Sequence, residues 1–227
     1  MEQRRFMRLV DKLVRRMRIG LTGKIPEEDV VAEKRSDLEM VWPESKFACL
    51  PHLSIPYGYE MRIYKSGDEQ AYFDLMDHAG FKGWNDREFA KYLKKILPDG
   101  FFILFHLSSG EMAATAMALH NPTELHPFGA SLSCVAADPI HQGKGLGFVV
   151  SAAVTRRILS CGYKEIYLET EDWRLPALKT YLKMGWEPFF YQGDMLLRWK
   201  GICESLNWPF TPNEWRKNPL ERLIGSF

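Results

Sequence analysis

Regular spacing of apolar residues along the chain begins at Tyr59. The run YEMRIY, residues 59–64, alternates apolar and polar positions and predicts a strand. Ser66 and Glu69 have the spacing of a capping box, which predicts the first turn of a helix. Residues 71–79 continue with apolar side chains three and four positions apart, so one face of this helix should be buried.

A second helix and three strands are predicted next. Asn85 is a favoured helix-capping residue, and the apolar positions that follow it run to Leu97, before Pro98 should stop the helix. The apolar runs after Pro98 are long enough for strands, and a turn at residues 108–110 should join the first two. These predicted strands are residues 101–107, 112–120 and 130–137.

The second half of the chain alternates between helix and strand patterns. Apolar residues at helical spacing from Leu146 to Ile158 predict a long helix that Gly162 closes. The remaining predicted elements are a strand at 164–170, a helix at 175–185, and a hairpin of strands 186–191 and 195–199. The order β-α-α-β-β-β-α-β-α-β-β predicts an α/β fold, with a mixed central sheet of about seven strands and helices on both faces.

The two ends lack this regularity, so one domain is expected at residues 57–200. Residues 1–20 hold seven Arg or Lys and apolar residues at helical spacing, which predicts a basic amphipathic helix. That helix should pack on the domain or on a second copy in a homodimer; contact with a membrane surface is the weaker alternative. Residues 21–56, with four prolines and mixed charge, should form an irregular surface segment, and residues 201–227 a tail.

Composition narrows the class of protein. The chain has 227 residues, of which 46% are hydrophobic, so it can bury a sizeable core. Its net charge of +1 gives no reason to expect a nucleic-acid partner. The four cysteines are far apart and form no Cys-x-x-Cys, so neither a metal site nor a disulfide framework is expected. No apolar run reaches the roughly 18 residues of a membrane span, and a cytoplasmic protein is expected.

A glycine-rich loop stands between the strand at 130–137 and the long helix. It reads Gln142, Gly143, Lys144, Gly145, Leu146, Gly147. Glycines at the start of a helix let backbone N–H groups converge on an anion, and the helix dipole adds partial positive charge. Lys144 is followed by glycine instead of Ser or Thr, which excludes a Walker A loop. Val150 replaces the third glycine of a dinucleotide fingerprint, so a pyrophosphate bound in another way is indicated.

Two motifs together resemble the GNAT superfamily of acetyl-CoA-dependent N-acetyltransferases. The loop fits the family's Arg/Gln-x-x-Gly-x-Gly/Ala phosphate motif. Further along, Arg174, Ala177, Tyr181, Gly185 and Trp186 fit its Asn-x-x-Ala-x-x-x-Tyr…Gly-Phe signature. Arg replaces the usual Asn and Trp the usual Phe, which puts the usual Asn contact to pantetheine in doubt. The resemblance covers residues 57–199 and implies the GNAT fold, with acetyl-CoA as acyl donor.

The resemblance also implies how the donor is held. Pantetheine should pair with the strand edge at Cys134, Val135 and Ala136, where a backbone N–H would polarise the thioester carbonyl. The phosphates should lie on the backbone amides of the glycine loop, with Lys144 nearby and with Arg174 and Ala177 on the pantetheine side. These residues are the expected donor-binding set.

The catalytic groups follow from the same comparison and from the chemistry. Tyr181 is the candidate general acid, because a phenol stays protonated at neutral pH and can protect a thiolate leaving group. Glu169 is the first candidate for the general base, with Glu171 and His120 as alternatives, although an amine can also lose its proton to water. The acceptor pocket is expected near residues 80–86 and 189–194, with Trp84, Phe190 and Asp194 as candidate lining residues.

Three functions remain open at this point. The first is N-acetylation of a small-molecule primary amine by direct attack in a ternary complex. The second is the same reaction on a protein or peptide amine, which an open groove would favour. The third is a GNAT module that senses CoA without catalysis, which the Arg174 substitution keeps open and the retention of Tyr181 disfavours.

Overall fold

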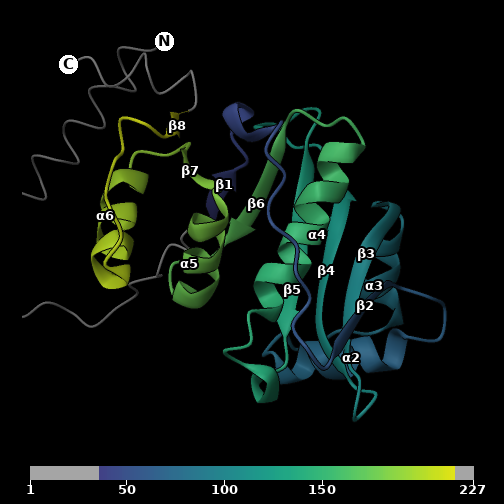
Figure 1. The fold of residues 1–227 in the computed structure, drawn as a ribbon. Helices are drawn as coiled ribbons and strands as arrows, with labels where there is room; N and C mark the ends of the chain where they lie inside the picture. Colours follow the sequence, from purple (N-terminus) through teal and green to yellow (C-terminus); the bar gives the residue numbers. More distant parts are fainter. Residues whose placement is uncertain (1–35, 218–227) are drawn as a thin grey trace, which may run out of the picture. The chain divides into compact units, whose positions relative to one another are not determined.

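The computed structural model describes residues 36–217, which contain one mixed eight-stranded sheet with helices packed against it (Figure 1). The strands are β1 (Leu38–Val41), β2 (Tyr59–Ile63), β3 (Ile96–His106), β4 (Met112–His120), β5 (Ala130–Ala137), β6 (Ile166–Thr170), β7 (Glu187–Phe190) and β8 (Arg216–Lys217). The α-helices are α2 (Glu69–His78), α3 (Asp86–Leu93), α4 (Leu146–Ser160), α5 (Leu175–Met184) and α6 (Met195–Leu206). Two short 3-10 turns, η1 (Glu44–Lys46) and η2 (Pro139–His141), complete these elements.

The sheet runs in the order β2-β3-β4-β5-β6-β1-β7-β8. The pairs β5–β6 and β7–β8 are parallel, and the other neighbours are antiparallel. Helix α4 covers one face of β3, β4 and β5, while α2 and α3 lie on the opposite face (Figure 1). The prediction of an α/β fold with a mixed sheet and helices on both faces is therefore confirmed.

Two apolar clusters on opposite faces hold the sheet between the helices. One buries α4, α5 and α6 against the sheet, with Val150, Val154 and Trp186 among its fully buried side chains. The other buries Tyr72 and Phe89, from α2 and α3, against β3, β4 and β5. The alternating apolar residues of β4 supply both faces, which explains why eight of its nine residues are buried.

The helix α2 forms where the apolar period predicted it, but the predicted capping box is wrong. Asp68 occupies the N-cap position and makes no side-chain cap bond; its carboxylate instead receives both Arg62 nitrogens at 2.7 Å. The carboxylate of Glu69 accepts from the backbone N–H of Gly67. The helix begins only at Glu69, so Ser66 lies before it, and the Asp68 carboxylate is occupied by Arg62 and by the backbone N–H of Lys65.

The second predicted helix ends earlier than expected. Asn85 caps α3 as predicted, with its side chain accepting from the N–H groups of Arg87 and Glu88. The helix stops at Leu93, and Ile96 and Leu97 belong to β3 instead. A register shift between Ile96 and Phe101 accommodates the proline in this strand, since proline cannot donate a ladder hydrogen bond.

The prediction that residues 21–56 are irregular is wrong for Leu38–Val41. These four residues form β1, which is inserted between β6 and β7 with all four side chains buried. The run LEMV is too short to show a period, and its charged second residue, Glu39, is typical of an exposed segment. Tertiary pairing on both edges decides its conformation.

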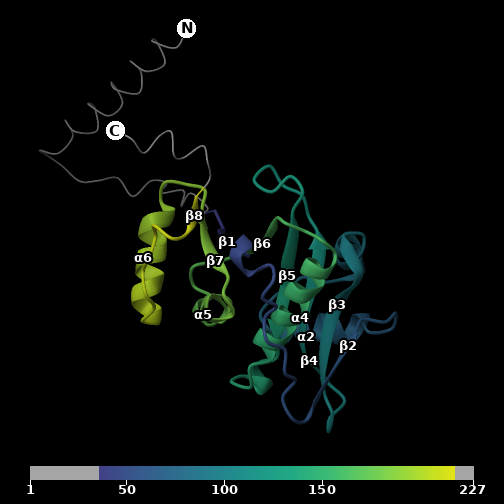
Figure 2. The same ribbon diagram turned by 45° about the horizontal axis from the view of Figure 1, so that its top comes forward.

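The predicted last strand at residues 195–199 is also wrong. This segment starts α6, and the buried positions Met195, Trp199, Ile202 and Cys203 recur at helical spacing. Helices α5 and α6 lie beside the β6-β1-β7 part of the sheet (Figure 2). Of the expected tail, residues 201–206 are helical and Arg216–Lys217 extend the sheet as β8. The predicted basic helix at residues 1–20 lies outside the described residues.

Candidate functional site

Strands β5 and β6 separate soon after they begin, which opens a wedge in the middle of the sheet. They pair in parallel only at Ala130–Ile166 and Ser131–Tyr167, and no further register pair joins them along the described strands. Both strands run in the same direction away from that point and diverge (Figure 1). Two cavities lie along the wedge, and both have Val135, Ala177 and Tyr181 in their walls.

A β-bulge interrupts β5 inside the wedge. Thr115 pairs with Ala136 and Met117 with Ser133, so Cys134 and Val135 together stand opposite one residue of β4. Cys134 has a φ of 53°, a left-handed conformation that is uncommon for a residue with a side chain. Such bulges break the ladder and re-aim backbone groups, and they are frequent beside active sites. The expected donor-binding strand is thus present with a locally freed backbone.

The first cavity, of about 490 Å³, lies over the start of α4. The loop positions Gln142, Gly143, Gly145, Leu146 and Gly147 line it, together with Val135, Ala136 and Ala177. Gly143 and Gly145 have φ values of 81° and 75°, which only glycine adopts without strain. A Cβ on Gly147 would meet nothing within 4 Å, so the space beside the helix N-terminus is open. Backbone amides and the helix dipole make this a suitable place for phosphate.

Lys144 does not face this cavity. Its ammonium lies 5.5 Å from the ring centre of Tyr59, on the side where Tyr59 and His106 border a shallower hollow. The hydroxyl of Tyr59 is 2.8 Å from Nδ1 of the buried His141. Lys144 therefore lies on the outer side of the loop, away from the cavity over the start of α4.

The hydroxyl of Ser151, one turn after Gly147 on α4, is the unexpected feature of this cavity. Ser151 lines the cavity and is fully buried, yet its Oγ has no hydrogen-bond partner within residues 36–217. Burying an unpaired hydroxyl costs free energy. The sequence offered no signal for this residue, because a serine in a helix looks like a surface position.

The second cavity, of about 600 Å³, opens on the other side of Tyr181. Its wall combines β5 and β6 residues with side chains from the α2–α3 connection and α3. It is lined by Asp37, Phe81, Glu88, Lys91, Tyr92, Lys95, Leu119, Asn121, Leu132, Ser133, Cys134, Glu169, Thr170, Glu171 and Arg174, besides the three shared residues. A volume of this size suits a small organic ligand.

All three cationic side chains of this wall already have partners. Lys91 contacts both carboxylate oxygens of Glu88 at 2.7 Å, and Lys95 donates to Asn121 at 2.9 Å. Arg174 is bonded to Glu171 and lies over the rings of Phe81 and Trp173, 4.4 and 4.3 Å from their centres. Arg174 therefore joins α5 to the α2–α3 connection and lines the second cavity, together with Cys134 and Ala177 of the expected donor-binding set.

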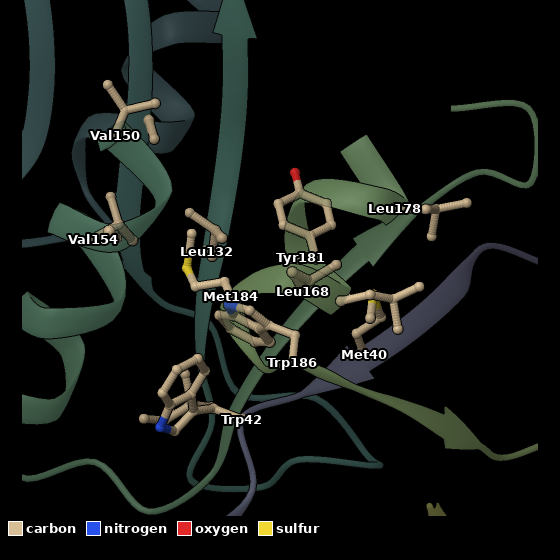
Figure 3. Packing of buried hydrophobic residues seen from close by; sticks show 14 of the residues in the cluster. Met40, Trp42, Leu132, Val150, Val154, Leu168, Leu178, Tyr181, Met184 and Trp186 are labelled. Atoms are coloured by element: carbon tan, nitrogen blue, oxygen red, sulfur yellow. The ribbon is translucent and has the colours of Figure 1, made fainter. Parts of the chain in front are cut away.

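Tyr181 stands where the two cavities meet. Its ring packs in the core, and its hydroxyl points away from Leu168 and Trp186 (Figure 3). Burial raises the pKa of Tyr181 well above its usual range, and the nearby Arg174 opposes that shift only in part. The phenol is therefore protonated at every physiological pH, as a proton donor must be.

Glu169 lies on β6 in the wall of the second cavity. Desolvation against that wall raises the pKa of its carboxyl, and the carboxylates of Glu39 and Asp37 raise it further. A carboxylate with raised proton affinity is a better general base than a fully solvated one. The alternatives are less suitable, since Glu171 is bonded to Arg174 and His120 contacts the Tyr163 hydroxyl at 2.9 Å outside the cavity wall.

Cys134 lines the same cavity but is a poor nucleophile. Burial raises the pKa of its thiol to about 12, so the reactive thiolate is scarce at neutral pH. This argues against an acyl-enzyme on Cys134 and in favour of direct attack by an acceptor.

The expected acceptor-pocket residues are only partly placed as predicted. Phe81, from the expected range 80–86, lines the second cavity, whereas Trp84 borders a separate hollow beside α2 and α3. Phe190 is buried in the core, and Asp194 lies 3.5 Å from Arg198. Residues 195–199 are helical, so the expected last hairpin does not form, and Phe190 and Asp194 line neither cavity along the wedge.

Metal and membrane features are absent from the part of the chain described. Among residues 36–217, no three His, Cys, Asp or Glu side chains gather as metal ligands would. No helix in the same range is long and apolar enough to cross a bilayer.

Comparison with known proteins agrees with the fold and the loop. Residues 69–186, just over half of the chain, match the model of the protein family described as "Acetyltransferase (GNAT) family". A mycothiol acetyltransferase of Rhodococcus erythropolis is 25% identical over 150 residues, which cover 62% of this chain and 50% of that protein. The chain thus spans about half the length of that relative.

Two further proteins to which the chain is similar are also named acetyltransferases, but not mycothiol acetyltransferases. Histone acetyltransferase TAP1 of Glycine max is 26% identical over 166 residues, 70% of each chain. The crystal structure of a GCN5-related N-acetyltransferase from Sphaerobacter thermophilus matches with a TM-score of 0.53 at 18% identity, over 68% of this chain and 49% of that one, which shows the shared fold. The family match over residues 69–186 contains both the glycine loop and Tyr181, and the chain belongs to the GNAT acetyltransferase family.

Proposed function

We propose that this chain transfers an acetyl group from acetyl-CoA to the primary amine of a small molecule, by direct attack in a ternary complex. The observation that carries the proposal is the junction of two cavities at Tyr181, one built for phosphate and the other holding an available carboxylate. A donor lying along the first cavity would present its acyl group where the second begins.

The donor side would use backbone groups more than side chains. Amides of Gly143, Gly145 and Gly147 and the N-terminus of α4 would bind the pyrophosphate. The bulge at Cys134 and Val135 supplies a backbone N–H that is re-aimed from the ladder and could polarise the thioester carbonyl. Lys144 would meet only the outer part of the donor.

The acceptor side would remove a proton and expose the amine lone pair. Glu169 accepts a proton from the bound ammonium, and the neutral nitrogen then attacks the thioester carbon. The C–N bond forms, the C–S bond breaks, and CoA leaves as the thiol. The raised pKa of Glu169 favours this proton uptake near neutral pH.

Tyr181 would act on the leaving sulfur. Its hydroxyl donates a hydrogen bond to the developing thiolate, which accepts the proton as the C–S bond breaks. Since burial raises the pKa of Tyr181, a free phenolate would be costly, so its proton must be replaced at once from the acceptor nitrogen. The hydroxyl is therefore best regarded as a donor that passes a proton on.

The cavity size favours a small acceptor over a protein chain. About 600 Å³ lies within the range of small-molecule sites, and the similarity to mycothiol acetyltransferases fits such an acceptor. The similarity to a histone acetyltransferase keeps a peptide amine as the second candidate. We also place the reaction in the cytoplasm, because the four cysteines are free thiols, as in reducing compartments.

The test is thiol release from acetyl-CoA with a panel of small amines and a matched panel of peptides with free α- or ε-amines. We expect turnover with small amines, and Glu169→Gln should lower kcat/KM by about 100-fold or more. Turnover only with peptides would replace the acceptor class. Saturable acetyl-CoA binding with no turnover on either panel would favour the CoA-sensing alternative.

A further inference from the structure

A buried carboxylate–imidazole pair lies beside Glu169 and takes no part in the reaction described above. Glu39 and His126 are 6% and 1% exposed, and Glu39 Oε2 is 2.8 Å from His126 Nε2. Ionisable side chains are rarely buried without a role, because removing them from water is costly. This pair therefore needs an explanation beyond the packing of the core.

The register of the sheet places this pair next to the candidate base. Glu39 on β1 is directly opposite Glu169 on β6 in the antiparallel ladder. Opposed residues of such strands share one face of the sheet, with Cβ atoms about 5 Å apart. The two carboxylates are thus neighbours on one face of the sheet, where Glu39 is buried against His126 of the loop 121–129 and Glu169 faces the second cavity.

The imidazole is held rigidly in its place. The ring of His126 stacks on that of Tyr167, with centres 4.3 Å apart and planes 14° from parallel. The hydroxyl of Tyr167 donates to the backbone oxygen of Asn121 at 2.7 Å and accepts from its side-chain amide at 2.6 Å. The loop 121–129 is thereby tied to β6, two residues before Glu169.

We propose that the Glu39–His126 pair is a positioning pair for Glu169, which fixes the electrostatic surroundings of that carboxylate and so determines the pH at which it can accept a proton. Strand β1 then completes the acceptor site instead of only extending the sheet. The inference rests on the proposed function, in which Glu169 is the base.

Other charged and titratable groups also face Glu169. These are Asp37 just before β1, Lys95 after α3, Tyr92 on α3 and Tyr167 on β6 itself. The carboxylate of Glu39 disfavours ionisation of Glu169, whereas a charged His126 favours it. Removing one member of the pair should therefore move the titration of Glu169 in one direction, and removing the other should move it in the opposite direction.

The experiment measures kcat/KM of the full chain against pH, with acetyl-CoA saturating and the best amine of the panel as acceptor. Glu39→Gln keeps the size of the side chain and an oxygen that accepts from His126, but removes the charge. We expect the acidic limb of this profile, the pH range in which kcat/KM rises as Glu169 loses its proton, to move to lower pH by about one unit. A shift of this size is expected when a neighbouring negative charge at short range is lost. His126→Gln should move the limb upward.

The controls separate a local electrostatic role from a structural one. Glu60→Gln changes an exposed glutamate on β2, an edge strand that is separated from β6 by three other strands, and should leave the acidic limb in place. Glu39→Asp retains the charge and should leave the limb close to that of the parent chain. Thermal unfolding of each variant reports whether it folds. If the variant at one member of the pair does not fold, the variant at the other member still tests the proposal.

Two results are distinguishable. If Glu169→Gln leaves the acidic limb unchanged, Glu169 is not the base and the proposed mechanism fails. If Glu169→Gln abolishes the limb, but the pair variants leave it in place or move it in the same direction, then the positioning role is overturned while the proposed function stands.

Discussion

Replacing Tyr181 with Phe isolates the contribution of one hydroxyl group. The ring is buried in the core and packs beside Leu168 and Trp186 (Figure 3), and Phe conserves nearly all of that packing. The residue borders both cavities and its hydroxyl makes no hydrogen bond within residues 36–217, so its removal leaves no partner unpaired there. The free energy of unfolding should therefore change by less than about 0.5 kcal/mol.

The effect on the reaction should be much larger. A positioned proton donor contributes about 100- to 10,000-fold to a rate, which corresponds to roughly 3–5 kcal/mol of transition-state stabilisation. Because the hydroxyl acts on the leaving sulfur, we expect kcat to fall by about that factor while the Kd of acetyl-CoA stays within about twofold.

The assay combines thiol release with calorimetry. Initial rates across acceptor concentrations give kcat, and titration of acetyl-CoA gives Kd for the same preparation. Leu178→Ile, a volume-conserving change in the same helix, serves as the control for disturbed packing. A kcat within twofold of the parent chain would refute the role of Tyr181, and a loss of acetyl-CoA binding would show that the hydroxyl serves the ground state instead.

Three further predictions concern the loop, the helix α4 and the surface. Gly147→Glu should abolish acetyl-CoA binding in calorimetry with little change in Tm, because the open space beside Gly147 would then hold a carboxylate against phosphate. Ser151→Ala should raise the stability of the ligand-free chain by about 1 kcal/mol in denaturant unfolding, since it removes an unpaired buried hydroxyl; a loss of stability would mean that the hydroxyl has a partner. Asp68→Asn should cost about 1 kcal/mol at pH 7. The bidentate bond from Arg62 lowers the pKa of Asp68, so its contribution is present above about pH 4 and is lost as pH falls through the folded-state value; an equal difference between parent and variant at pH 2 would contradict this.

The elements around the glycine loop were predictable because local signals agree there. The apolar run of β5, the glycines with positive φ, and the 3.6-residue period of α4 all give the same result. Tyr181 and Ala177 face the wedge because they lie four residues apart on α5. Local propensity, pattern and tertiary structure coincide there, so the sequence alone was sufficient to predict the elements that line the first cavity.

The acceptor side was less predictable, because its parts come together only through pairing across the sheet. Strand β1 has four residues and no period, and only its two neighbours, β6 and β7, give it structure. Nothing local relates Glu39 to Glu169, which are 130 positions apart. The bulge at Cys134 likewise depends on how β4 and β5 pair and has no signature in the sequence.

The start of α6 was missed for a different reason. The five residues MLLRW are too few for their apolar pattern to distinguish a strand from a helix. The buried positions that would reveal the helical period, Ile202 and Cys203, lie beyond this segment. A longer window would have shown the helical period. The consequence was functional, since the expected acceptor pocket included Phe190 and Asp194, which line neither cavity along the wedge.

Calorimetric titration of acetyl-CoA into the full chain tests the central claim most directly. The account predicts saturable binding at one site, with a Kd that Tyr181→Phe leaves unchanged and Gly147→Glu raises beyond measurement. Absence of binding to the parent chain, or equal binding to the Gly147→Glu variant, would contradict the assignment of the wedge as the acetyl-CoA site.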